Sequence, residues 1–362
     1  MEERHIPCTN GIVYRKTDGL LRYQGWPSVC ADGDGVLYAV CSGYRMNHVC
    51  PFGKSLLFIS RDQGKTWSNP IVVNDTVLDD RDTGIVWLGG KKLLITWFIH
   101  PAHIYLDHYA EGMMNACTPA EAPTMRAGID NLENYRDQPE LGGSFIRLSE
   151  DGGMTWGETI RIPVSAPHGP NVLSDGRLLY VGKQMYSDAE PEGNVAAYES
   201  TDGGHTWNRI GTIPFPEGTE ANCFHEPHVI ELEDGSLLAA LRSEGKLAFS
   251  VYLTRSYDGG RTWSIPEATG FIGSPPHLLR HSSGAIICTY GRRTAPFGER
   301  AAVSYDGGKT WPVEYVLRDD APHGDLGYPC TAELPDGSLF TVYYQPYAPE
   351  EKDSLLYTHW SL

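Results

Sequence analysis

The chain has 362 residues with 46 acidic and 29 basic side chains, which give a formal net charge of -17 at pH 7. Because a phosphate backbone needs a basic face, this charge argues against a nucleic-acid partner. No apolar run approaches the roughly 18 residues of a membrane-spanning helix, and the first residues lack a basic and apolar leader. We therefore expect no membrane partner and a cytoplasmic location, or secretion if a leader has been removed.

From the N-terminus, the first predicted elements are a strand around Gly11-Ile-Val-Tyr14 and a hairpin that begins at Trp26. The hairpin has two apolar runs on either side of an Asp-Gly turn, which is a typical two-strand signal. An eight-residue box, Ser-x-Asp-x-Gly-x-Thr-Trp, follows at residues 60–67. Its Asp and Ser can hydrogen-bond their own backbone, its Gly can supply a positive φ, and its Trp can pack back over the turn. We interpret the box as a structural turn.

The same hairpin and box alternate along the rest of the chain. Further hairpins begin at Arg81, His168, His225, Pro275 and Tyr328. Further boxes occupy residues 149–156, 200–207, 256–263 and 304–311. Three of the four intervals between the box tryptophans fall in the range of a four-stranded propeller blade. Six hairpins and five boxes therefore predict an all-β fold, a six-bladed β-propeller.

The first interval between boxes is longer than the others because it holds an insertion at about residues 101–142, within the second blade. This segment is rich in Ala, Met, Glu and Asn and lacks alternation, so we expect a short helix or an ordered loop. The last segment, 354–360, supplies only one strand. The strand at 11–14 can complete the last blade and close the ring, which leaves few free sheet edges. We expect residues 1–362 to form one domain.

Residues at the starts of the innermost strands should meet at one end of the propeller axis. Titratable and aromatic side chains stand at these starts, namely Trp26, Arg81, Asp82, His168, His225, Glu226 and Tyr328. Three arginines at the far ends of hairpins can lean over the same opening: Arg45, Arg242 and Arg293. A convergent polar rim of this kind is a candidate active site.

At these positions the chain resembles the retaining sialidases, a family of six-bladed propellers that carry the same boxes. The segment from Glu226 to Arg242 resembles the hairpin that joins the family's catalytic Glu to an Arg of its carboxylate-binding triad. Tyr328 stands where the family has its nucleophile, and Arg293 is the best match to another triad Arg. The resemblance implies an exo-acting glycoside hydrolase that releases a terminal sialic acid or a related keto-deoxy sugar with retention of configuration.

The chemistry of these residue types is consistent with that implication. A neutral Tyr suits a sugar that carries its own carboxylate beside the reacting carbon, and sialidases are the Tyr exception among glycosidases. Glu226 would accept the proton of Tyr328 as the hydroxyl attacks. Arg242 and Arg293 would bind the substrate carboxylate through paired hydrogen bonds.

Two positions depart from the family pattern. Gly25 stands where the first triad Arg is expected, and Arg45 is a candidate replacement. Residues 46–54, before the first box, contain no carboxylate where the family has its acid/base Asp. Asp82 and His48 are the candidate replacements. A carboxyl beside Arg81 is expected to keep a low pKa, whereas a His titrates near neutrality and can donate a proton.

Two other functions fit the same residues. His168 or His225 could act with Tyr328 and the arginines in β-elimination on a uronic-acid glycan, as in a polysaccharide lyase. A propeller that has lost its acid could instead bind carbohydrate without catalysis. A metal site at His225 and His228 is disfavoured, because residues three apart on a strand point to opposite faces. We therefore expect an acidic sugar or glycan as partner and neither cofactor nor metal, while a homo-oligomer stays open.

Overall fold

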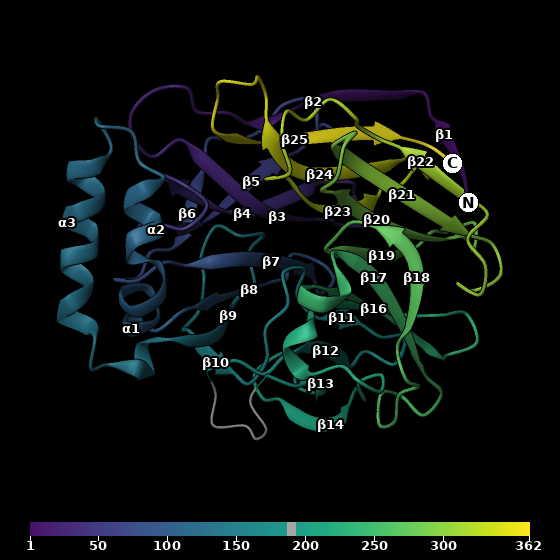
Figure 1. Ribbon diagram of the computed structural model, residues 1–362. Coiled ribbons are helices and arrows are strands. Elements are labelled where there is room, and N and C mark those ends of the chain that lie inside the picture. Colours follow the sequence, from purple (N-terminus) through teal and green to yellow (C-terminus); the bar gives the residue numbers. More distant parts are fainter. Residues whose placement is uncertain (187–192) are drawn as a thin grey trace.

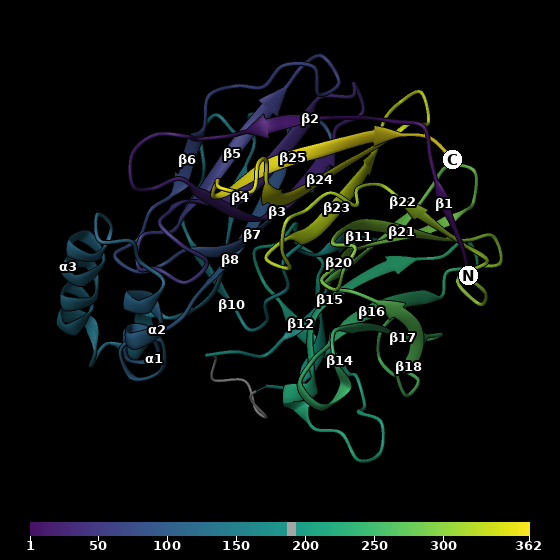
Figure 2. The ribbon, with the colours of Figure 1, turned by 45° about the horizontal axis from the view of Figure 1, so that its top comes forward.

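The computed structural model describes residues 1–186 and 193–362, and six β-sheets make up most of it. The sheets are arranged as the blades of a propeller, which confirms the predicted six-bladed fold (Figures 1 and 2). In each blade the first strand of the predicted hairpin lies innermost, and these six strands line the central channel.

The first three blades follow one another along the chain. Blade 1 contains β3 (Tyr23–Ala31), β4 (Leu37–Arg45), β5 (Lys54–Ser60) and β6 (Ile71–Asn74). Blade 2 contains β7 (Arg81–Trp87), β8 (Leu93–Ile99), β9 (Gly143–Ser149) and β10 (Ile160–Ile162). Blade 3 contains β11 (Asn171–Val172), β12 (Leu178–Lys183), β13 (Val195–Ser200) and β14 (Asn208–Thr212).

The last three blades include both ends of the chain. Blade 4 contains β15 (Phe224–Glu231), β16 (Leu237–Ser243), β17 (Ser250–Ser256) and β18 (Glu267–Ile272). Blade 5 contains β19 (Pro276–Arg280), β20 (Ile286–Arg292), β21 (Gly298–Ser304), β22 (Val313–Val316) and, parallel to β22, β1 (Glu2–His5). Blade 6 contains β23 (Gly327–Glu333), β24 (Leu339–Pro346), β25 (Asp353–Trp360) and β2 (Cys8–Tyr14). Because β2 pairs with β25, the strand predicted around residues 11–14 completes blade 6 and closes the ring.

The five boxes form turns that satisfy their own polar groups. In the first box, the Asp62 carboxylate accepts hydrogen bonds from the backbone N–H and the hydroxyl of Thr66 at 2.9 and 2.6 Å. Ser60 Oγ accepts a hydrogen bond from the Gly64 N–H at 2.8 Å, and Trp67 Nε1 donates to the Gly64 carbonyl at 3.2 Å. Equivalent carboxylate contacts recur at Asp151, Asp202, Asp258 and Asp306. These contacts confirm that the boxes are structural turns.

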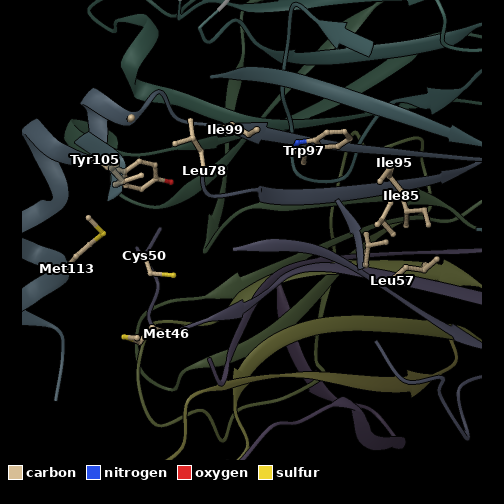
Figure 3. Packing of buried hydrophobic residues seen from close by; sticks show 14 of the residues in the cluster. Met46, Cys50, Leu57, Leu78, Ile85, Ile95, Trp97, Ile99, Tyr105 and Met113 are labelled. Carbon is tan, nitrogen blue, oxygen red and sulfur yellow. The ribbon is translucent and has the colours of Figure 1, made fainter. Parts of the chain in front are cut away.

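The insertion between β8 and β9 folds into short helices at the side of the propeller (Figure 1). It consists of α1 (Ala102–Ile104), η1 (Tyr105–Tyr109), α2 (Ala110–Asn115), α3 (Ala122–Leu132), η2 (Glu133–Tyr135) and η3 (Pro139–Leu141). Tyr105 and Met113 of the insertion share one hydrophobic cluster with Met46 and Cys50, which follow β4 (Figure 3). The expected helical structure is therefore present, and apolar packing fixes it against blade 1.

Two short turns of 3-10 helix flank the ends of blade 4 strands. They are η4 (Ala221–Cys223) and η5 (Gly245–Leu247). Among the described residues, no helix is both long and apolar enough to cross a membrane.

Side chains connect the innermost strands around the channel, because these strands do not pair with one another. The Leu278 N–H donates to His228 Nδ1 at 3.1 Å, and the Thr331 N–H donates to His277 Nδ1 at 3.4 Å. Each contact satisfies a backbone group that the inner edge of a blade leaves free. The second halves of the innermost strands line a cavity of about 490 Å³ at this end of the channel. The strand starts lie at the opposite end.

Candidate active site

Four innermost strands begin with the same distortion, a bulge that holds a non-glycine residue in the left-handed conformation. The residues are Trp26 (φ 51°), Asp82 (φ 51°), Glu226 (φ 47°) and Tyr328 (φ 51°). Register shifts in β3, β7, β15 and β23 occur at these positions. Backbone strain of this kind costs about 1–3 kcal/mol per residue and is concentrated at functional sites. The bulges give four blades equivalent side chains at one mouth of the channel.

Tyr328 and Glu226 form a hydrogen-bonded pair in this mouth. The Tyr328 hydroxyl donates to Glu226 Oε1. Arg242 Nη1 lies 2.6 Å from Glu226 Oε2 and 3.3 Å from Tyr328 Oη. Burial, together with the negative charges of Glu226 and Asp82, raises the pKa of Tyr328 well above its ordinary value. Tyr328 therefore keeps its proton in the resting protein and needs a base to become a nucleophile.

Arg242 and Arg293 lie on the ring of Phe249, beside this pair. Their guanidinium carbons are 4.9 and 5.8 Å from the Phe249 ring centroid, and Arg293 is 5.7 Å from that of Tyr328. Arg242 Nη2 donates to Glu244 at 2.7 Å. Among the described residues, Arg242 Nε and Arg293 Nη2 are buried without a hydrogen-bond partner. Buried donors of this kind indicate where the oxygens of a ligand can bind.

Trp26 packs against two of the predicted substrate-binding arginines. The guanidinium carbons of Arg45 and Arg81 lie 4.5 and 4.3 Å from its ring centroid. Both arginines pair with the buried carboxylate of Asp79, which also accepts a hydrogen bond from the Tyr105 hydroxyl at 2.7 Å. Because Arg45 is completely buried, it supports Trp26 from behind. Tyr105 ties the helical insertion to the same cluster.

Asp82 is a buried carboxyl close to the charges of the mouth. It is 7% exposed, and its Oδ1 has no hydrogen-bond partner within residues 1–186 and 193–362. Burial raises the pKa of Asp82 to about 7, because the loss of water and the charge of Glu226 outweigh the opposing charge of Arg81. The expectation of a low pKa beside Arg81 was wrong, since it left out the cost of desolvation.

His48 lies at the rim of the mouth and is held by a carboxylate that the sequence analysis missed. Its ring stands edge-on to Trp26, with 4.9 Å between centroids, and its Nδ1 is 2.9 Å from Asp325 Oδ1. Asp325 also accepts hydrogen bonds from the Tyr23 and Tyr344 hydroxyls at 3.1 and 3.0 Å. These partners come from blades 1 and 6, so the only local signal was an acidic residue shortly before the last bulge.

A tyrosine ring fills the place of the absent triad arginine. A Cβ atom at Gly25 would lie 2.9 Å from Cε1 of Tyr23. The Tyr23 hydroxyl in turn contacts both His48 Nδ1 and the Asp325 carboxylate. This side of the mouth therefore presents a hydroxyl, an imidazole and a carboxylate where the family pattern has a cation.

His168, a predicted substrate-binding residue, lies inside the channel. Its ring centroid is 5.0 Å from that of His277 and 5.7 Å from that of His228, and its Nδ1 is 2.9 Å from Ser28 Oγ. It precedes the two-residue strand β11, and Gly169 takes the positive φ there. The side chain consequently packs with the channel histidines.

His225, the other predicted histidine, contacts Lys183 and Glu244 rather than the channel histidines. Its Nδ1 is 2.9 Å from Lys183 Nζ, and its Nε2 is 2.9 Å from Glu244 Oε1. Since Glu244 also binds Arg242, His225 is connected to the mouth through that carboxylate. Within the described residues, no group of three His, Cys, Asp or Glu side chains has the arrangement of a metal site.

Comparison with known proteins agrees with the boxes and with the propeller fold. The model of the BNR repeat-like domain matches residues 134–342, and that of the BNR/Asp-box repeat matches residues 58–69. These boxes and blades define an Asp-box propeller of the sialidase superfamily. The chain belongs to the BNR repeat-like domain family.

Three similar proteins illustrate the relationship. An anhydrosialidase from Macrobdella decora is 27% identical over 60% of this chain, which spans only 32% of that relative. A protein of unknown function from Dyadobacter fermentans has the same fold, with a TM-score of 0.76, 23% identity and 98% of each chain covered. The intramolecular trans-sialidase from Ruminococcus gnavus gives a TM-score of 0.70 and 16% identity, with 98% of this chain and 97% of that chain covered. At these identities the two structures establish the fold alone.

Proposed function

We propose that the protein is an exo-acting, sialidase-like glycoside hydrolase that releases a terminal acidic sugar with retention of configuration. The sugar would be a sialic acid or a related keto-deoxy sugar. The observation that carries this proposal is the contact of Tyr328, Glu226 and Arg242, in which a buried hydroxyl meets a carboxylate beside a guanidinium. The name of the Macrobdella decora relative supports the same class of substrate.

In the proposed reaction, Tyr328 Oη attacks the anomeric carbon while Glu226 takes the hydroxyl proton. A neutral phenol avoids the repulsion that a carboxylate nucleophile would meet from the carboxylate of the sugar. Glu226 is already the acceptor of the Tyr328 proton, so no rearrangement precedes the attack. The negative charge that develops on Tyr328 Oη in the transition state is stabilised by the nearby cation of Arg242.

The substrate carboxylate would bind between Arg242 and Arg293. Arg293 offers its free Nη2, and Arg242 offers its free Nε, since Glu226 and Glu244 occupy the other nitrogens of Arg242. Charge-assisted hydrogen bonds to a carboxylate satisfy such donors best. Trp26, predicted to bind substrate, is instead buried with Arg45 and Arg81 packed on its ring, so it would support the mouth from beneath.

A product assay tests the proposal. The protein is incubated with a fluorogenic sialoside, with the corresponding keto-deoxy-nonulosonic glycoside and with uronic-acid glycans, and the products are identified by NMR and mass spectrometry. We expect a free acidic sugar, first released as the retained anomer. An anhydro sugar would instead indicate intramolecular transfer. An unsaturated sugar would indicate a lyase in place of a hydrolase. Binding without turnover would indicate a carbohydrate-binding propeller.

The pH dependence of sugar binding tests the role of Asp82. With its pKa raised to about 7, this carboxyl is neutral below pH 7 and negative above it. Since a new negative charge in the mouth repels an acidic sugar, we expect the affinity for free sialic acid to fall by about 3- to 10-fold between pH 6 and pH 8. Isothermal titration calorimetry measures this change, and Asp82→Asn should remove it.

Asp80→Asn is the matched control for this measurement. Burial also raises the pKa of Asp80 to about 7, but this carboxyl binds Thr76 and Asn74 away from the mouth. The variant should keep the pH dependence of the wild type. A pH dependence that survives in Asp82→Asn would contradict the assignment.

A further inference from the structure

The reaction needs a group that protonates the leaving group, and the geometry around His48 defines its usable nitrogen. Burial alone would raise the pKa of Asp325, but hydrogen bonds from His48 and Tyr344 hold it down, at about 2. An ionised Asp325 can only accept hydrogen bonds. The proton of the 2.9 Å contact therefore sits on His48 Nδ1, which leaves Nε2 as the nitrogen that gains and loses a proton.

The position of His48 is fixed from both sides. Arg45 Nη2 donates to its backbone carbonyl at 3.0 Å, and Arg81 Nη1 does so at 3.4 Å. Its ring stands edge-on to Trp26, whose own ring lies 6.4 Å from that of Tyr328. The Trp26 ring therefore lies next to both His48 and the proposed nucleophile Tyr328.

Exposure separates the two candidates for the acid. In an exo-acting hydrolase the leaving group is the rest of the glycan, so its oxygen must point out of the mouth toward solvent. The His48 side chain is 42% exposed at the rim, whereas Asp82 is a buried residue close to Glu226. A carboxyl buried beside the base can contact the sugar but does not face the aglycone.

We propose that His48 is the acid/base residue of the reaction and that Asp325 is its positioning residue; this inference rests on the proposed function. In the first step the bond from Tyr328 Oη to the anomeric carbon forms, the glycosidic C–O bond breaks, and the leaving oxygen takes the proton of His48 Nε2. In the second step water gives a proton to His48 Nε2 and its oxygen bonds to the anomeric carbon. The bond to Tyr328 breaks as this bond forms, and the phenolate recovers its proton from Glu226.

Several charged groups set the proton affinity of His48. The partial loss of hydration at the rim lowers its pKa, the hydrogen bond and charge of Asp325 oppose that change, and the cations of Arg81 and Arg293 add to the lowering. The Tyr23 hydroxyl is a further neighbour, at 3.0 Å from Nδ1. For a substrate that needs the acid, kcat/KM should therefore fall as pH rises through a value below the ordinary 6.5. Loss of the Asp325 charge should move that fall to lower pH.

The experiment compares leaving groups attached to the same sugar. One substrate carries an activated aryl group that departs without a proton, and the other carries an alkyl or sugar aglycone. His48→Asn, with His48→Gln as a second variant, should lower kcat/KM for the alkyl glycoside by about 10²- to 10³-fold and for the aryl glycoside by less than about tenfold. Because the second step also lacks its base, the aryl glycoside should give a burst of released alcohol followed by slow turnover.

Asp325→Asn should lower kcat/KM by less than the His48 variants do, again more for the alkyl than for the aryl glycoside. It should also move the fall of kcat/KM to lower pH. The matched controls are Asp320→Asn, whose carboxylate binds Arg318 in the same loop, and His359→Asn, whose ring contacts Ser338 on blade 6. Both should match the wild type in activity. Denaturation curves of all variants separate loss of folding from loss of chemistry.

Each outcome of this comparison decides between the assignments. Equal losses on the two substrates in both His48 variants would overturn the role of His48. A larger loss on the alkyl than on the aryl glycoside in Asp82→Asn would show that Asp82 is the acid. If the wild type turns over neither glycoside, the proposed function fails and this inference fails with it. If the wild type turns over both, the proposed function stands and the variants test the role of His48 alone.

Discussion

Replacing Tyr328 with phenylalanine is expected to lower kcat/KM of the proposed hydrolysis by about 10³-fold or more, which corresponds to about 4 kcal/mol of transition-state stabilisation. The change removes the oxygen proposed to bond to the anomeric carbon and leaves Glu226 without the hydroxyl proton that it accepts in the resting protein. The ring remains to fill the buried space, so the fold should be kept. Steady-state kinetics with the fluorogenic glycoside measures the loss, and mass spectrometry of the quenched wild type should show a glycosylated Tyr328.

The control for this substitution is Tyr343→Phe on the next strand of blade 6. Tyr343 is also buried, and its hydroxyl contacts Thr358 at 3.0 Å and Arg318 at 3.2 Å, away from the mouth. This variant loses comparable hydrogen bonds and should stay active. Full activity of Tyr328→Phe, or equal losses in the two variants, would contradict a nucleophilic Tyr328.

Much of the mouth could be predicted from sequence because the position of each strand relative to the boxes repeats from blade to blade. The boxes determine which strand of each hairpin is innermost, and the residue before an innermost proline is often the bulged one, as in Trp26-Pro27, Glu226-Pro227 and Tyr328-Pro329. Three local patterns thus located three side chains that come from three blades. Arg242 followed from its place at the end of the hairpin that Glu226 begins.

Position within the repeat did not predict a side chain's location where that side chain depends on partners from other blades. His168 has the expected phase, yet Gly169 takes the left-handed position and the histidine packs into the channel. Asp325 is identified only by hydroxyls from β3 and β24. Arg45 was expected at the open mouth, but Asp79 and the ring of Trp26 hold it inside. Desolvation and long-range pairing decide these cases, and neither has a local signature.

Asp79 illustrates how a residue that need not contact substrate can still determine the shape of the mouth. It is completely buried, and its carboxylate neutralises Arg45 and Arg81, the two cations that pack on Trp26. Those same arginines hold the His48 carbonyl. The Tyr105 hydroxyl brings the helical insertion to the same carboxylate. The insertion therefore stabilises the mouth from behind.

Asp79→Asn is accordingly expected to lower the free energy of unfolding by about 3–5 kcal/mol, because it leaves two guanidinium groups without their counter-charge in a buried site. Burial alone would raise the pKa of Asp79, but Arg45 and Arg81 hold it below its ordinary value. The difference from the wild type should therefore persist above the ordinary carboxyl range and shrink only as pH falls through the folded-state pKa. Urea denaturation at several pH values measures this difference in the free energy of unfolding.

Asp75→Asn is the control. It breaks a half-exposed pair with Lys54 and should lower the free energy of unfolding by less than about 1 kcal/mol. Equal losses in the two variants would show that Asp79 does not hold the arginines behind Trp26.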